Sequence, residues 1–150
     1  MYNECISQKK CEQEDAMGRF LNPGNEAFSE VIHSEIYVDK TPLLEYTNKV
    51  ISTTSKFICS SRPRRFGKSI TAEMLSAYYS KGCDSRALFA DYAICKASSF
   101  EKHLNQYDVI HFDVQWCMMD AGNADQVVEY INHGIPVSYT HLRAHETSAH

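Results

Sequence analysis

The sequence predicts an α/β fold in which crossover helices join parallel strands. Residues 56–60 and 107–114 are short runs rich in apolar, β-branched and aromatic residues, which are typical of strands. Between them, residues 68–81 repeat apolar side chains at the spacing of one helix face, and a further helix is expected over 98–105. Because the order strand, helix, helix, strand favours parallel strands with crossover connections, we expect an α/β architecture.

The N-terminal elements follow from turn and capping signals. Residues 1–16 mix charges of both signs without apolar periodicity, so we expect a polar upstream extension and a natural start at Met17. A turn cluster at 22–25 precedes apolar side chains at helical spacing over 28–32. Thr and Pro at 41 and 42 are an N-cap and a first helical residue, which predicts a helix over 41–50.

The central helix has a clear apolar face and a clear end. Its apolar side chains are Ile70, Met74, Leu75 and Tyr78. Gly82 is a natural stop for this helix. In the strand before it, we interpret Cys59 as a small buried apolar residue.

Composition limits the size and class of the protein. The chain has 150 residues, which is enough for one domain and short for two. Hydrophobic residues make up 43% and charged residues 23%, so disorder throughout is excluded. The net charge of -4 excludes coating of nucleic acid by bulk charge, so a basic site has to be local.

The compartment follows from missing signals. No apolar run reaches the roughly 18 to 20 residues that cross a bilayer, and the polar start lacks the apolar stretch of a secretory signal. We therefore expect a cytoplasmic protein with no membrane partner. The six cysteines contain no C-x-x-C pair, and in that compartment we expect reduced thiols.

The loop before the central helix carries the strongest functional signal. Gly67, Lys68 and Ser69 stand where a strand and loop lead into a helix, as in the rear half of a phosphate-binding loop. Glycine lets the backbone approach phosphate, the first helical N–H groups face the anion, and Lys68 adds an ammonium group. Ser69 would place its hydroxyl on Mg²⁺. The pattern predicts nucleotide phosphate binding.

The front half of the loop departs from the general Walker A pattern. The first glycine of that pattern is replaced by Arg62, and Pro63 follows it. Arginine resists positive φ and proline lacks an amide donor, so the loop has to use fewer amides and more guanidinium groups. We therefore add Arg64, Arg65 and Phe66 to the predicted nucleotide-binding residues.

At these residues the chain resembles the AAA-ATPase-like family of bacterial P-loop proteins. Two segments carry the resemblance: Ser-Arg-Pro-Arg-Arg-Phe-Gly-Lys-Ser at 61–69 and Tyr-Val-Asp-Lys-Thr at 37–41. The first is the usual form of the loop in that family. The resemblance covers about residues 17–135 and implies the N-terminal part of a P-loop NTPase-type domain, with ATP and Mg²⁺ as ligands.

The same resemblance implies further roles. It places Tyr37 and Asp39 at the edge of the nucleotide base or ribose, although burial and helix capping explain them equally well. Full-length members often carry a restriction-endonuclease-like nuclease domain after the ATP-binding domain, which makes nucleic acid a partner of that further domain. The target of the full-length protein and the oligomeric state stay open.

Hydrolysis of ATP requires carboxylates that the chain does not offer in the usual place. An acidic residue at a strand end holds the magnesium water shell, and a second carboxylate orients the attacking water. Asp113 is the local candidate, but residues 114–116 contain no second carboxylate. In the family the acidic pair belongs to a segment that would lie beyond residue 135. We expect Asp113 to serve a turn, a cap or the edge of the site. We assign no catalytic residue and expect ATP binding without hydrolysis.

The last residues, 136–150, change in character. Residues 137–147 look like translated adapter sequence, so we expect a non-native tail. His141 and His145 have the spacing of two metal ligands on one helix face, but His145 and His150 are too far apart for the zinc-protease motif. We expect no metal site there.

Two other interpretations are compatible with the same sequence. Arg62, Arg64, Arg65 and Lys68 place four cations within seven residues, which also suits a module that binds polyanions or nucleic acid. Saturable binding of Mg-ATP separates this alternative from the phosphate loop. A third possibility is a chain that does not fold stably, because the predicted strands would lack partners at their edges.

Overall fold

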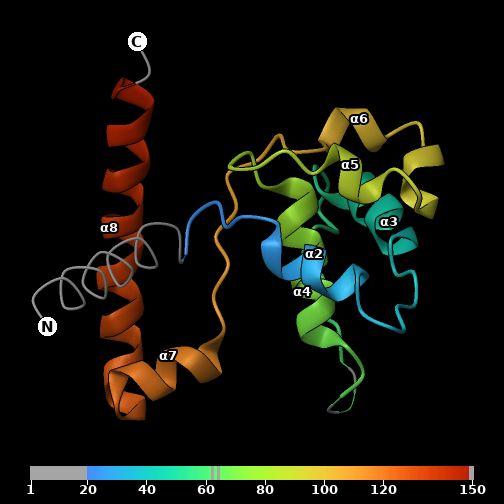
Figure 1. The fold of residues 1–150 in the computed structure, drawn as a ribbon. Helices are drawn as coiled ribbons and strands as arrows, with labels where there is room; N and C mark the ends of the chain where they lie inside the picture. Colours follow the sequence, from blue (N-terminus) through green and yellow to red (C-terminus); the bar gives the residue numbers. More distant parts are fainter. Residues whose placement is uncertain (1–19, 62, 64, 149–150) are drawn as a thin grey trace, which may run out of the picture. The chain divides into compact units, whose positions relative to one another are not determined.

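The computed structural model describes the backbone of residues 20–61, 63 and 65–148, with side chains up to residue 140. The chain divides into two compact units, which are described separately (Figure 1). The first comprises Gly24–Val109, and the second combines the described residues before Gly24 with those from Ile110 onward. Both are built from helices and loops.

Short helices surround one longer helix in the first unit. Its elements are α2 (Glu26–Ile32), α3 (Pro42–Val50), α4 (Lys68–Tyr79), α5 (Arg86–Phe89), η1 (Ala93–Lys96) and α6 (Phe100–His103). The helices predicted over 41–50 and 68–81 are confirmed by α3 and α4. The helix expected over 98–105 is shorter than predicted and comprises only α6.

The start of α3 shows how a cap residue can serve another element. Thr41 occupies the N-cap position before Pro42, as predicted, but its side chain makes no capping bond to α3. Instead, its hydroxyl accepts a hydrogen bond from the Ile94 backbone N–H at 3.2 Å. Thr41 therefore ties the start of α3 to η1.

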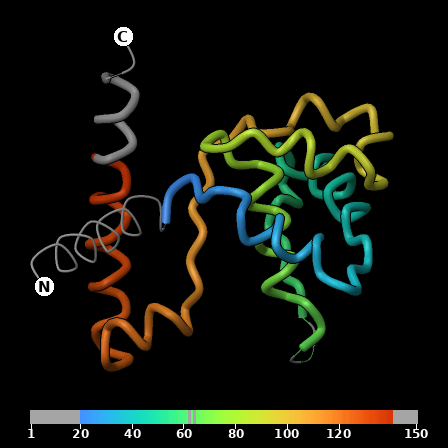
Figure 2. Tube along the Cα trace, in the orientation of Figure 1, coloured from blue at the N-terminus to red at the C-terminus, as the bar shows by residue number. Residues whose placement is uncertain are grey.

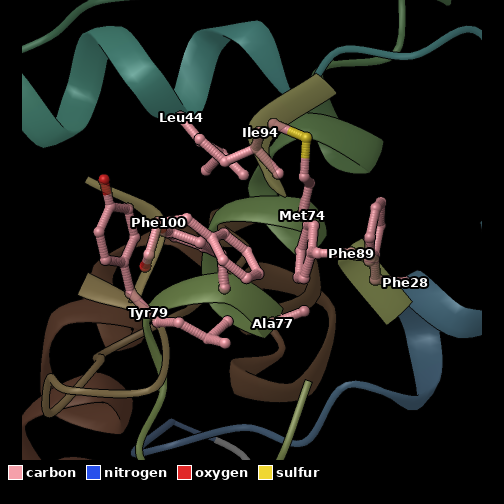
Figure 3. Packing of buried hydrophobic residues seen from close by; sticks show 10 residues of the cluster. Phe28, Leu44, Met74, Ala77, Tyr79, Phe89, Ile94 and Phe100 are labelled. Carbon is pink, nitrogen blue, oxygen red and sulfur yellow. The ribbon is translucent and has the colours of Figure 1, made fainter. Parts of the chain in front are cut away.

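The core of this unit forms around the C-terminal half of α4. Met74, Ala77 and Tyr78 are fully buried, and helix α2 packs against α4. Figure 3 shows side chains from neighbouring elements converging on this face. The buried members of the cluster are Phe28, Leu44, Met74, Ala77, Tyr78, Tyr79, Phe89, Ile94, Phe100 and Leu104. The apolar spacing that predicted α4 marks this face, so the contacts explain why the helix forms.

Buried tyrosine hydroxyl groups at the end of α4 form hydrogen bonds with polar groups of α3 and α6. Tyr79 donates to Asn48 Oδ1 at 2.7 Å, and its hydroxyl lies 2.6 Å from Thr47 Oγ1. Asn48 donates to the Tyr78 hydroxyl, which in turn donates to the Phe100 carbonyl. Burial is the largest cause that raises the pKa of Tyr79 to about 12. These bonds link α3 and α6 to α4.

A single asparagine organises the turn after α4. Asn105 has a φ of 53°, in the left-handed region that asparagine tolerates better than most residues. Its side-chain amide donates to the Ser80 carbonyl at 2.6 Å and the Ala77 carbonyl at 3.2 Å, and its oxygen accepts the Ser85 N–H. Asn105 thereby caps the C-terminal end of α4.

His103 makes the stability of the first unit dependent on pH. Burial, followed by repulsion from Lys102, lowers the pKa of His103 below the ordinary 6.5. Its Nδ1 lies 2.6 Å from the Tyr107 hydroxyl, and the two rings stack. The imidazole of His103 therefore binds a proton at higher pH in the unfolded chain than in the folded chain. As a result, the contribution of neutral His103 to the free energy of unfolding is complete above about pH 6.5 and declines below it.

We therefore expect the free energy of unfolding to fall on acidification through this range. Urea titrations at about pH 7.5 and about pH 5.5 measure the change in wild type and in His103→Asn, which does not titrate. The variant should show a smaller difference between the two conditions. An identical difference in both proteins would assign the pH dependence to other groups.

The second unit pairs two helices around a small apolar cluster. Its elements are α7 (Val114–Ala121), η2 (Ala124–Gln126) and α8 (Val127–Ser148), whose course is seen in Figure 2. Phe20, Cys117 and Val127 form the buried centre, and Phe20 meets Tyr130 edge to face. A Cβ added to Gly134 would lie 2.4 Å from the Phe20 ring, so α8 needs glycine where it meets this ring.

The boundary predicted at residue 136 falls inside α8. This helix continues through Pro136 to Ser148, and Ser138 is buried. The apolar cluster itself ends at Ile135. The assignment of 136–150 as a non-native tail stays a prediction. Within the described residues, no helix is long and apolar enough to span a membrane.

The two predicted strands are not formed in the described part of the chain, so the predicted parallel sheet is wrong there. Residues 56–60 form no regular element and are exposed, and Phe57 is 86% exposed. Over 107–114, only Tyr107 and Ile110 form single bridges, to Ser80 and Leu21, before α7 begins at Val114. A strand needs a neighbour for its backbone hydrogen bonds, and composition alone does not supply one.

Candidate phosphate-binding loop

The predicted loop leads directly into α4 through a left-handed glycine. Gly67 is the N-cap residue, with a φ of 72°, which a side chain would disfavour by roughly 1–2 kcal/mol. Its carbonyl accepts the first helical bond from the Thr71 N–H at 3.0 Å and a second from the Thr71 hydroxyl at 2.9 Å. Glycine is therefore required where the loop becomes a helix.

The first turn of α4 presents polar groups to solvent. No side chain caps Gly67 or the first turn within the described region. The opening N–H groups of a helix have no partner inside the helix and carry its partial positive charge. Lys68 and Ser69, the first two residues of α4, are exposed. The start of α4 therefore combines amide donors, an ammonium group and a hydroxyl.

The arginines of the loop are described only in part. Arg62 and Arg64 lie outside the described residues. Arg65 is exposed and has a φ of 67°, so a non-glycine residue takes the left-handed conformation two positions before Gly67. Phe66, between Arg65 and Gly67, is 60% exposed. Sequence reasoning assigned resistance to positive φ to Arg62 and missed that Arg65 adopts it.

Lys40 reaches this loop from the other segment that carries the family resemblance, Tyr-Val-Asp-Lys-Thr. Its Nζ atom lies 3.4 Å from the Gly67 carbonyl oxygen and 3.5 Å from that of Phe66. A Cβ added to Gly67 would lie 2.1 Å from the same Nζ atom. Lys40 was not among the predicted site residues, although the segment that contains it was one of the two family signals.

Asp39 holds the backbone on either side of Lys40. Its Oδ1 atom accepts the Thr41 N–H at 2.8 Å, in a local turn typical of aspartate. Its Oδ2 atom accepts the Ala93 N–H at 3.1 Å. The side chain of Asp39 thus anchors this segment to η1. Asp39 is exposed and makes no capping bond to α3, and its place at a nucleotide base or ribose stays a prediction.

Tyr37 packs inside the first unit. Its ring meets Phe28 and Tyr92 edge to face, at centroid distances of 6.0 Å and 5.4 Å. Burial is the largest cause that raises the pKa of Tyr37 above its usual value. These contacts account for Tyr37 as a packing residue, and its place at a nucleotide base or ribose stays a prediction.

Asp113 caps a helix, as expected from the sequence. Its Oδ1 atom accepts the Gln115 N–H at 2.7 Å and the Trp116 N–H at 3.4 Å, at the start of α7. These bonds satisfy two otherwise unpaired amides of that helix. The Oδ1 atom of Asp113 therefore acts as the N-terminal cap of α7.

The remaining candidate residues form no metal centre in the region with described side chains. No three His, Cys, Asp or Glu residues come together there in a way that could hold a metal ion. The side chains of His141 and His145 lie outside that region. Cys59 is exposed, so its interpretation as a buried strand residue is wrong, and the described cysteines Cys59, Cys83, Cys95 and Cys117 are free thiols.

Comparison with protein families gives an independent result. The model of a family described as "AAA-ATPase_like: Predicted AAA-ATPase" matches residues 23–149. The chain belongs to the predicted AAA-ATPase family. The match contains both the Tyr37–Thr41 segment and the loop at Gly67–Ser69. Searches of curated proteins and of solved structures found no significant match.

Membership of the predicted AAA-ATPase family confirms the resemblance drawn from the two sequence segments. The matched range starts after residues 1–16 and continues across residue 136 to residue 149. It identifies the family without identifying which residues contact a ligand.

Proposed function

We propose that this member of the predicted AAA-ATPase family binds Mg-ATP at the start of α4. The observation that carries the proposal is the left-handed Gly67, which opens α4 beside exposed Lys68 and Ser69. A helix start without a capping side chain suits a phosphate group, because its N–H groups and dipole favour negative charge. Family membership supports nucleotide phosphate as that anion.

The available groups fit the ligand chemically. The Lys68 ammonium balances phosphate charge, the Ser69 hydroxyl is a hard oxygen ligand of the kind that Mg²⁺ prefers, and Gly67 allows close approach of the backbone. Arg64 and Arg65 precede these three residues in the sequence and would add guanidinium groups. Bound Mg²⁺ would neutralise part of the triphosphate charge. The residues of the loop would hold and orient the phosphates.

We further propose that binding by this chain is not followed by rapid hydrolysis. The candidate for a magnesium-side acid, Asp113, accepts two backbone amides of α7 through its Oδ1 atom. Phosphoryl transfer needs precisely placed carboxylates, each commonly worth several kcal/mol of barrier. No residue of the described part is therefore assigned to proton transfer or to orientation of water.

A titration with Mg-ATP tests the proposal. We expect saturable binding at one site, with weaker binding of Mg-AMP, because AMP lacks the β- and γ-phosphates that Lys68 would contact. Calorimetry at two salt concentrations measures both affinities, and a short single-stranded DNA serves as competitor. The polyanion alternative predicts instead that DNA displaces ATP and that the affinity depends steeply on salt. That outcome, or the absence of saturation, would contradict the proposed function.

A further inference from the structure

The ammonium group of Lys40 lies against two successive carbonyl groups of the loop. Its Nζ atom is 3.5 Å from the Phe66 oxygen and 3.4 Å from the Gly67 oxygen. An ammonium has only donors, so it favours an arrangement in which both oxygens turn toward it. The Gly67 oxygen also accepts the Thr71 N–H and hydroxyl, so Lys40 and Thr71 together restrict the peptide unit that joins Gly67 to Lys68. Lys40 also restricts the unit that joins Phe66 to Gly67.

The geometry of a trans peptide determines the direction in which the Gly67 and Lys68 N–H groups point. The described chain contains no cis peptide bond, and in a trans unit the C=O and the following N–H point in opposite directions. When the Phe66 and Gly67 oxygens face Lys40, the N–H groups of Gly67 and Lys68 face away from it. Successive amides that point to one side form an anion-binding concavity.

Lys40 is itself held in place by its neighbours. Asp39 accepts hydrogen bonds from the Thr41 and Ala93 N–H groups, and the Thr41 hydroxyl accepts one from Ile94. The backbone of Lys40 is thereby fixed on both sides to η1. Because the anchor is rigid, the side chain meets the loop with little further loss of backbone entropy.

We propose that Lys40 is a positioning residue, which turns the Phe66 carbonyl toward itself and, together with Thr71, holds the Gly67 carbonyl, and so presents the Gly67 and Lys68 amides to the phosphates of the nucleotide. This inference rests on the proposed function, since it assigns a role at the same loop. Lys40 acts here through the backbone of the loop and not as a phosphate ligand.

The test compares Lys40→Met with Lys40→Arg and a matched control. Lys49→Met removes one lysine charge from an exposed ion pair with Glu45 on α3, away from the loop residues that Lys40 contacts. Nitrogen-proton NMR spectra of the nucleotide-free proteins report the Gly67 and Lys68 amides directly. Calorimetry reports Mg-ATP affinity, and circular dichroism confirms that each variant is folded.

We expect Lys40→Met to shift the Gly67 and Lys68 amide signals before nucleotide is added and to weaken Mg-ATP binding about tenfold. Lys40→Arg, which keeps the donors, should restore most of the affinity, and Lys49→Met should change neither readout. Weaker binding without a signal shift in the free protein would make Lys40 a direct phosphate ligand and overturn the positioning role.

Failure of the two proposals can be told apart. If Lys68→Ala weakens binding while Lys40→Met changes neither the amide signals nor the affinity, only the role of Lys40 is overturned. If wild-type protein does not bind Mg-ATP, the proposed function fails and the role of Lys40 fails with it.

Discussion

Lys68→Ala is expected to weaken Mg-ATP binding by roughly tenfold to a hundredfold. The ammonium group stands at the exposed start of α4, and a charge-assisted contact with phosphate contributes about 1.5–3 kcal/mol, where about 1.4 kcal/mol corresponds to tenfold. Calorimetric titration of the two proteins measures the difference. The fold should survive, because Lys68 contributes nothing to the apolar cluster around α4.

A second lysine provides the control for this change. Lys49→Ala removes the same charge from an exposed pair with Glu45, so it should leave the affinity for Mg-ATP unchanged. Equal affinities of wild type and Lys68→Ala would remove the phosphate-loop assignment. Equal losses in both variants would show that binding depends on overall charge, as the polyanion alternative predicts.

Phe89→Ala should lower the free energy of unfolding by about 3–5 kcal/mol. Its ring is fully buried, stacks on Phe28 at 5.2 Å and meets Tyr78 edge to face at 5.5 Å. Truncation removes apolar area and leaves a cavity between α2 and α4 that the surrounding rings fill only in part. Urea denaturation followed by circular dichroism measures the loss.

The control for Phe89→Ala is Phe57→Ala. Phe57 lies in the exposed segment for which the sequence predicted a buried strand. Because Phe57 is 86% exposed, we expect its truncation to change the free energy of unfolding by no more than about 0.5 kcal/mol. A loss as large as that of Phe89→Ala would mean that residues 56–60 are buried, as the apolar pattern alone had indicated.

The comparison of Phe57 with Tyr78 shows which part of the fold is readable from sequence. The face of α4 that contains Tyr78 repeats with the helical period, and a helix satisfies its own backbone, so the pattern predicts both the element and its buried side. Residues 56–60 have an equally apolar pattern. Their pairing depends on a neighbour that the pattern does not specify.

The candidate site was predictable to a similar degree. Gly67, Lys68 and Ser69 could be recognised because their spacing follows directly from the chemistry of phosphate binding. Lys40 could not, since its contact with the loop spans 27 residues and depends on how Asp39 ties the segment that contains Lys40 to η1. Local chemistry is visible in sequence, whereas contacts between distant segments require the fold.

The burial of α4 changes along its length, from exposed Lys68 and Ser69 to buried residues between Ser76 and Tyr79, where Asn105 holds its last carbonyls. The free energy of local opening follows such a gradient, from near zero at a fraying end to the global value in a core. In α4 the packed end is therefore the harder end to open, while at the other end the Gly67 carbonyl is held by two bonds from Thr71. A ligand at the exposed end would order the side chains of Lys68 and Ser69, and part of its interaction energy would be offset by the side-chain entropy lost there.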